Sequence, residues 1–245
     1  MDARQYLSGI RVVLSRTSHP GNIGAAARAM KTMGFTDLVL VEPRHFPDPD
    51  ATAMAAGAAD ILEGARVVAT LPAALADRTL AVGFSARGRD LSHPPASLRS
   101  LVPSMLEEGG GVALVFGNET SGLSNEELAL CQRFASIPAN PEYSSLNVAA
   151  AVQVACYDLA MGADAHPLPT AGIRSAATGD DLRGLFEHLE SSTLASGYWD
   201  PARPGRFMER MRRLFARTGL EREEVRLIRG MLSAFDSRMR SKGHE

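Results

Sequence analysis

Short aliphatic runs recur along the first 160 residues of the chain, separated by longer segments rich in alanine. Five such runs begin at Ile10, Leu38, Ala65, Thr79 and Gly111. They alternate little between hydrophobic and polar residues, which predicts strands that are buried on both faces. Helical composition is found in segments 22–35, 50–60, 95–108 and 124–132. This alternation predicts an α/β domain with a mostly parallel sheet and helices on both faces.

The pattern changes after Leu159. Segment 161–179 is rich in Gly, Ala, Pro and Thr, which is typical of a linker. Three helical segments follow, near 180–194, 206–217 and 221–240. The second of them carries Met and Phe at helical spacing, which indicates a packed core. We therefore expect a domain at 1–162, a linker at 163–179 and a small α-helical C-terminal subdomain at 180–245.

Composition narrows the class of protein. The chain is 45% hydrophobic and 22% charged, as in soluble globular proteins. Its two cysteines, Cys131 and Cys156, lack metal-like spacing, so we expect no metal and a reducing cytoplasm. The N-terminus has no signal-peptide pattern and no apolar run is long enough for a membrane helix, so we expect a cytoplasmic protein without a membrane partner.

Charge is unevenly distributed. Residues 201–245 carry a net charge of +6, whereas the rest of the chain carries −8. A basic tail on an acidic body indicates a nucleic-acid partner. A solvated helix with Glu–Arg pairs, as in LEREEVRLIR, explains the same composition.

Polar residues and glycines gather where three of the predicted strands end, which is where open α/β sheets bind ligands. The first place is HPGNIGAAARAM, where Gly21 and Gly24 are expected to allow a tight strand-to-helix turn. Asn22 lies at this turn, and Arg28 stands among alanines, where an arginine needs a partner. The spacing is not the G-x-G-x-x-G of dinucleotide-binding proteins, which weakens a dehydrogenase hypothesis.

The second place is VFGNETSGLSNEEL, in which Gly117, Glu119 and Gly122 follow the strand from Gly111. Ser124 and Glu127 form an S-x-x-E capping box, which explains the helix start but not the preceding loop.

The third place is IPANPEYSSLNVAAAVQVA, where Ile137 ends a short strand and a long apolar helix follows. Ser144 or Ser145 is expected to cap that helix. This leaves Asn147 and the other serine for the site.

In this order, segments 22–28, 116–123 and 137–148 resemble the three motifs of the SPOUT superfamily of RNA methyltransferases, in its TrmH-like branch. The resemblance implies a deep trefoil knot at the C-terminal side of the domain, a homodimer, and S-adenosyl-L-methionine as cofactor. It implies a cofactor site lined by Phe84, Ser85, Ala86, Gly117, Ile137, Ser144, Ser145 and Leu146. Much of that recognition would come from backbone groups, with glycine at 117 allowing close approach.

The same resemblance implies transfer of a methyl group to a ribose 2′-hydroxyl of tRNA, at cytidine or uridine 32 of the anticodon loop. The residues nominated for catalysis are Arg28, Ser145, Asn147, Asn22 and Glu119. Arg28 has been proposed as a base in related enzymes, but its guanidinium pKa above about 12 favours a role in gripping phosphate and orienting the hydroxyl. Ser145 and Asn147 would then hold Arg28 or the ribose.

Two further arginines, Arg87 and Arg89, follow the fourth strand, and near such a pocket we expect them and Arg28 to bind RNA. Alternative functions are methylation of another RNA such as rRNA, and a non-catalytic RNA-binding SPOUT module.

Overall fold

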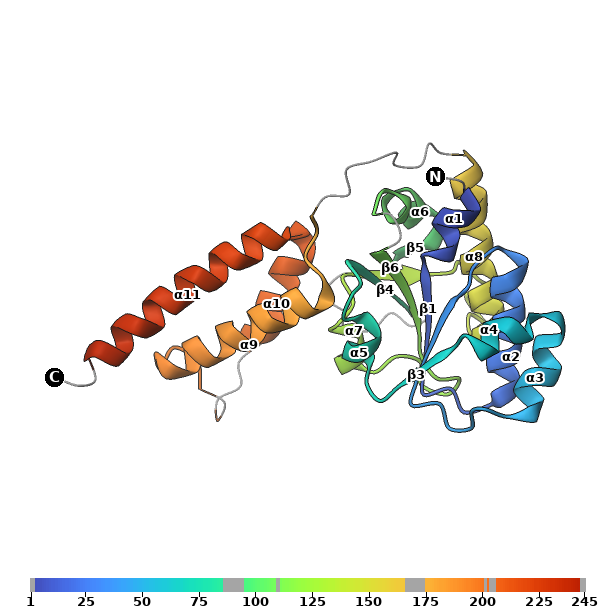
Figure 1. Cartoon of the computed structure of the whole chain (residues 1–245), viewed down its shortest axis with the longest axis horizontal. Coiled ribbons are helices and arrows are strands. Elements are labelled where there is room, and N and C mark those ends of the chain that lie inside the picture. The colour runs from blue at the N-terminus through green and yellow to red at the C-terminus, as the bar shows by residue number, and fades with distance from the viewer. Residues whose placement is uncertain are drawn as a thin grey trace. The chain divides into compact units, whose positions relative to one another are not determined.

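The computed structural model describes residues 3–85, 95–108, 111–165, 175–200, 202 and 206–242, and in this part of the chain seven parallel strands form one sheet (Figure 1). The strands are β1 Arg11–Ser15, β2 Asp37–Val41, β3 Arg66–Val68, β4 Leu80–Phe84, β5 Ala96–Ser97, β6 Val112–Phe116 and β7 Arg133–Ser136. Their spatial order is β3-β2-β1-β6-β4-β7-β5. Strands β1, β6, β4 and β7 are therefore neighbours, and their carboxyl ends bring distant loops to one edge of the sheet.

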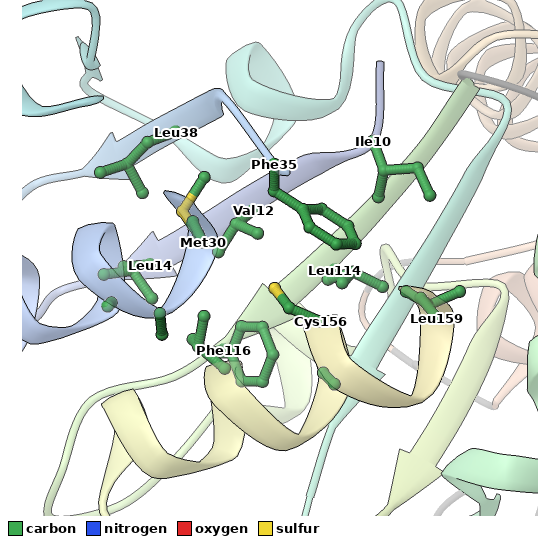
Figure 2. Packing of buried hydrophobic residues seen from close by; sticks show 14 of the residues in the cluster. Ile10, Val12, Leu14, Met30, Phe35, Leu38, Leu114, Phe116, Cys156 and Leu159 are labelled. Carbon is green, nitrogen blue, oxygen red and sulfur yellow. The ribbon is translucent and has the colours of Figure 1, made fainter. Parts of the chain in front are cut away.

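Helices cover both faces of this sheet, as predicted. They are α1 Ala3–Ser8, α2 Pro20–Thr32, α3 Pro49–Ala55, the 3₁₀ turn η1 Ala56–Ala58, α4 Ala59–Glu63, α5 Leu71–Leu75, α6 Leu98–Glu107, α7 Asn125–Leu128 and α8 Val148–Ala165. Alternate strand residues enter two different cores. Val12 and Leu14 pack with α2 and α8 in the larger core, shown in Figure 2, whereas Val13 packs in the smaller core with α5 and α7.

Gly24 sets the packing of α2 against α3. A Cβ atom at this position would lie 2.0 Å from the Ala51 carbonyl oxygen. Both Gly21 and Gly24 lie inside α2, which begins at Pro20. The expectation that they form the strand-to-helix turn is therefore wrong: Gly24 is needed for close approach of two helices.

Three predicted elements differ from the structure. Strand β3 is an edge strand that pairs only with β2 among the described strands, and Arg66 and Val67 are exposed, so it is not buried on both faces. The helix expected at 50–60 is interrupted at Ala56, where φ is +48°, and divides into α3, η1 and α4. The helix expected at 124–132 ends after Leu128, because residues 129–132 turn toward β7.

Helix α8 continues to Ala165, three residues into the linker expected at 163–179. The small residue Gly162 lets α8 lie against Val102 of α6, where a Cβ atom would be 2.3 Å from the valine Cγ1. Packing thus outweighs the low helix propensity of glycine.

The chain forms two compact units, residues 1–173 and 174–245. The second unit contains α9 Gly179–Ala195, α10 Phe207–Thr218 and α11 Arg222–Lys242. All three helices were predicted. Thr178 and Asp181 form a capping box at the start of α9. Leu185 and Val225 are the centre of a small core between α9 and α11. Among the described residues, no helix is both long enough and apolar enough to span a bilayer.

Candidate active site

A pocket opens at the carboxyl ends of β4, β6 and β7 and at the start of α8. Seven of the eight predicted cofactor-site residues line it: Phe84, Ser85, Gly117, Ile137, Ser144, Ser145 and Leu146. The eighth, Ala86, lies outside the described residues, as do Arg87 and Arg89. The second and third sequence motifs, 116–123 and 137–148, thus line one pocket together with the end of β4, whereas no residue of the first motif, 22–28, is in the lining.

The pocket has an apolar wall and a polar rim. The rings of Phe84 and Phe116 stack at 4.3 Å between centroids and form part of the wall. The polar residues of the lining include Ser85, Ser144 and the loop after β6, residues 117–122. Such a surface suits a ligand with both a flat apolar part and hydrogen-bonding groups.

Gly117 is required by the loop that it begins. A Cβ atom on Gly117 would lie 2.1 Å from the carbonyl carbon of Gly122 and 2.1 Å from the amide nitrogen of Leu123. The loop returns this closely because Gly122 has a φ of +68° and its amide donates to the Asn118 carbonyl at 3.0 Å. The neighbour that excludes a side chain at 117 is therefore the loop backbone itself, a reason that the sequence did not reveal.

Glu119 joins the pocket loop to the segment after β1. Its Oε2 accepts hydrogen bonds from the Ser18 amide at 3.0 Å and the Ser18 hydroxyl at 2.7 Å. Its Oε1 accepts from the His19 amide at 3.2 Å and from Asn22 Nδ2 at 2.8 Å. Burial of the carboxylate raises its pKa, but the hydrogen bonds from Asn22 and Ser18 outweigh burial and lower the pKa to about 2.

Asn147 extends this network to helix α8. Its Nδ2 donates to Asn22 Oδ1 at 2.9 Å, and its Oδ1 accepts from the Ala149 amide at 2.9 Å. The second bond is that of a helix N-cap. Asn147 therefore caps α8, and the expectation that Ser144 or Ser145 does so is wrong, which leaves both serines in the pocket lining.

Arg28 lies apart from these groups. Its side chain is exposed on α2, six residues or about 9 Å along the axis from Asn22. Within the described part of the chain, its guanidinium forms no hydrogen bond or ion pair, and Arg28 does not line the pocket. Ser145 and Asn147 form no hydrogen bond with it, and Glu119 fixes the loop rather than the arginine. The sequence expectation of a direct link to Arg28 is therefore not met within one chain.

Sequence reasoning missed Ser18 and the second role of Glu127. Besides its place in the capping box, the buried Glu127 accepts a hydrogen bond from the Ser15 hydroxyl and lies 3.5 Å from Arg16 Nη2. The polar run SRTSHPG after an apolar strand was the available signal for both.

Comparison with known proteins agrees with this geometry. The profile of the SpoU rRNA Methylase family matches residues 9–157, and the profile of the C-terminal domain of the tRNA methyltransferase TrmJ matches residues 180–244. The chain is 45% identical over 240 residues to tRNA (cytidine/uridine/adenosine-2′-O-)-methyltransferase TrmJ of Pseudomonas aeruginosa, covering 93% of each chain.

Solved structures give the same result. The crystal structure of TrmJ from Z. mobilis ZM4 has a TM-score of 0.82 and 32% identity, covering 92% of this chain and 98% of that one. A structure titled for 2-OH methylation of C/U34 on tRNA has a TM-score of 0.53 and 27% identity, covering 64% of this chain and 97% of that one. The resemblance inferred from the three motifs is confirmed, and this chain belongs to the SpoU rRNA Methylase family.

Proposed function

We propose that this protein transfers a methyl group from S-adenosyl-L-methionine to a ribose 2′-hydroxyl in the anticodon loop of tRNA. The observation that carries the proposal is the position of Glu119. It lies on the loop that lines the pocket and also holds Ser18 and Asn22 at the start of α2. One loop therefore links a small-molecule pocket to the polar residues beside it.

The residues of the pocket fit the proposed cofactor. The aromatic and aliphatic wall, with Phe84 and Ile137, suits a flat base, and the hydroxyls of Ser85 and Ser144 suit polar groups. The bound cofactor would supply an electrophilic methyl group. The residues of this chain would bind it, exclude water from it and leave one side open to the ribose.

The network around Glu119 serves to position groups. A carboxylate with a pKa of about 2 that already accepts four hydrogen bonds is a poor base for a ribose hydroxyl. The hydrogen bond between Asn147 and Asn22 holds the start of α8 against the start of α2, which is also a positioning role. Ser145, exposed in the pocket lining, is the described side chain best placed to contact the ribose.

Arg28 is proposed to bind the phosphate beside the target nucleotide. A guanidinium remains protonated at neutral pH and forms paired hydrogen bonds with phosphate oxygens. Its exposed side chain, without a partner among the described residues, is available for such a bond. Orientation of the 2′-hydroxyl by a fixed phosphate then lowers the barrier through proximity.

The substrate position follows from two sources. The motif resemblance implies cytidine or uridine 32, and the relative whose title names position 34 covers only 64% of this chain while being covered almost completely itself. That relative is therefore the shorter protein, whereas the profile of the TrmJ C-terminal domain matches residues 180–244 of this chain. On this basis position 32 is proposed and position 34 is the alternative.

The expected homodimer and knot belong to the same proposal. Tyr157 and Met161 lie one turn apart on α8 and are 47% and 44% exposed, although the other side of α8 packs in the larger core. A second copy packed along this side would cover them. The knot is proposed because residues 9–157 match the SpoU rRNA Methylase family, on which the expectation of a knot rests.

The test is to incubate the full chain with tRNA and methyl-labelled S-adenosyl-L-methionine and to map the modified nucleoside. Label on the 2′-oxygen of nucleotide 32 is expected. A transcript with 2′-deoxyribose at position 32 is the matched control and should take up no label. Label on nucleotide 34 instead would identify position 34 as the methylated nucleotide. Methylation of a base, of rRNA fragments only, or of no RNA would overturn the proposed function.

A further inference from the structure

Helix α11 carries an apolar stripe on a side that does not face the core of the C-terminal unit. Leu227, Met231 and Phe235 are 64%, 51% and 56% exposed, although each is a large hydrophobic residue. The core side of the same helix, with Val225 and Ile228, packs against α9. A stripe of exposed apolar residues at this spacing indicates a surface that another element covers.

The stripe ends in opposite charges. Glu224 and Arg238 are exposed and lie seven residues before and after Met231. At 100° per residue, both lie within about 20° of Met231 around the helix axis. Neither forms an ion pair with another described residue, although Glu224 Oε2 accepts from the Glu221 amide at 2.8 Å.

The spacing is that of a helix-pairing seam. Residues 224, 227, 231, 234 and 238 follow the alternating three- and four-residue steps of the a and d positions in a coiled coil, and Phe235 flanks this seam next to Ala234. The side chains at these positions are acidic, apolar, apolar, small and basic in that order. The small residue Ala234 allows close approach of a second helix.

We propose that α11 pairs in an antiparallel manner with α11 of a second copy of this chain, about a twofold axis through Met231. Antiparallel pairing places Leu227 opposite Phe235, since both are four residues from the axis. It also places Glu224 opposite Arg238 at both ends of the seam.

Parallel pairing fits the seam poorly, because it would place acid beside acid and base beside base. A nucleic acid also fits this side poorly, because its phosphates would meet an apolar stripe with a carboxylate at one end.

Cysteine cross-linking of the full chain tests the proposal. The native Cys131 and Cys156 are buried and free, so an introduced thiol on α11 is the accessible one. Met231→Cys is expected to form a disulfide-linked dimer under mild oxidation, because the axis brings two copies of residue 231 together. Leu227→Cys and Phe235→Cys should each cross-link poorly alone but well when mixed. Ser233→Cys, exposed on the opposite side of α11, is the matched control and should react at least tenfold more slowly.

Charge exchange provides the second readout. Glu224→Arg or Arg238→Glu should each reduce the cross-linking rate of Met231→Cys at low salt, and the combined exchange should restore it. The helix content of each variant is checked by circular dichroism, because Glu224→Arg also removes the hydrogen bond from the Glu221 amide at the start of α11, whereas Arg238→Glu removes none among the described residues. Equal rates for Met231→Cys and Ser233→Cys would overturn the proposal. Absence of cross-linking between chains, or protection of Met231→Cys by tRNA alone, would overturn it as well. None of these outcomes depends on methyl transfer, so the proposed function is tested separately.

Discussion

Replacement of Glu119 by glutamine tests the link between the pocket loop and the segment after β1. The four groups that contact the carboxylate are all donors: the Ser18 amide and hydroxyl, the His19 amide, and Asn22 Nδ2. In Glu119→Gln, the new NH₂ group must face two of these donors, whichever way the amide is turned. At least two hydrogen bonds are lost although the shape of the side chain is kept.

The size of the effect follows from the pKa of Glu119. A fall from 4.5 to about 2 corresponds to an upper bound of about 3 kcal/mol in favour of the folded, ionised state. Because the side chain is partly exposed, solvent screening reduces the expected loss to about 1–2 kcal/mol. The folded-state pKa is depressed, so this stabilisation is complete above pH 4.5 and is lost as the pH falls toward 2. The difference between wild type and Glu119→Gln should therefore shrink over this range.

Amide hydrogen exchange measures this directly. At pH 7, the Ser18 and His19 amides of Glu119→Gln should exchange about tenfold faster than in wild type, because 1.4 kcal/mol is a tenfold change in the opening equilibrium. Exchange in α9–α11 should not change. Glu63→Gln, an exposed glutamate on α4, is the control and should behave as wild type. Unchanged exchange at Ser18 and His19, or a difference that persists at pH 2, would refute the reasoning.

Three further predictions concern other parts of the molecule. Arg28→Ala should reduce methyl transfer at least 100-fold while calorimetry gives near-normal cofactor affinity; equal turnover would exclude the proposed phosphate contact. Gly117→Ala should displace the pocket loop, because of the 2.1 Å approach, and so weaken cofactor binding in calorimetry at least tenfold, whereas unchanged affinity would show that the loop relaxes freely. Asp77→Asn should lower the denaturant-unfolding free energy by about 2 kcal/mol, because the buried Arg11 loses its 2.6 Å ion pair but keeps Asp37; a change below about 0.5 kcal/mol would contradict this.

The positions of the pocket residues could be predicted because a parallel sheet fixes where loops meet. Once the strands at Thr79, Gly111 and Ile137 were recognised, their carboxyl ends had to lie at one edge, and the motif residues followed them. The local roles could not be predicted in the same way. Asn147 and Ser144 are both acceptable N-caps in sequence, and the structure distinguishes them by the bond from the Ala149 amide to Asn147 and by the bond from Asn147 to Asn22, which lies far away in the chain.

The main error in the predicted fold concerns β3, which lies at the edge of the sheet. The run ARVVAT has the composition of a buried strand, and its β-branched residues do predict β structure. Whether such a strand is central or at the edge depends on what lies beside it, which is β2 alone for β3. Likewise, the capping signal at Ser124 predicted the start of α7 but not its end after Leu128, where the chain must enter β7.

Under the proposed function, the hydrogen-bond network around Glu119 positions the substrate but does not remove its proton. With a carboxylate pKa of about 2 and uncharged amides at Asn22 and Asn147, the network does not titrate between pH 5 and 9. Geometry at the site should therefore be constant with pH, and any break in the rate of methyl transfer there must come from another group. The proton acceptor is then to be sought on the RNA, in solvent or on a side chain outside the network, while the network contributes orientation.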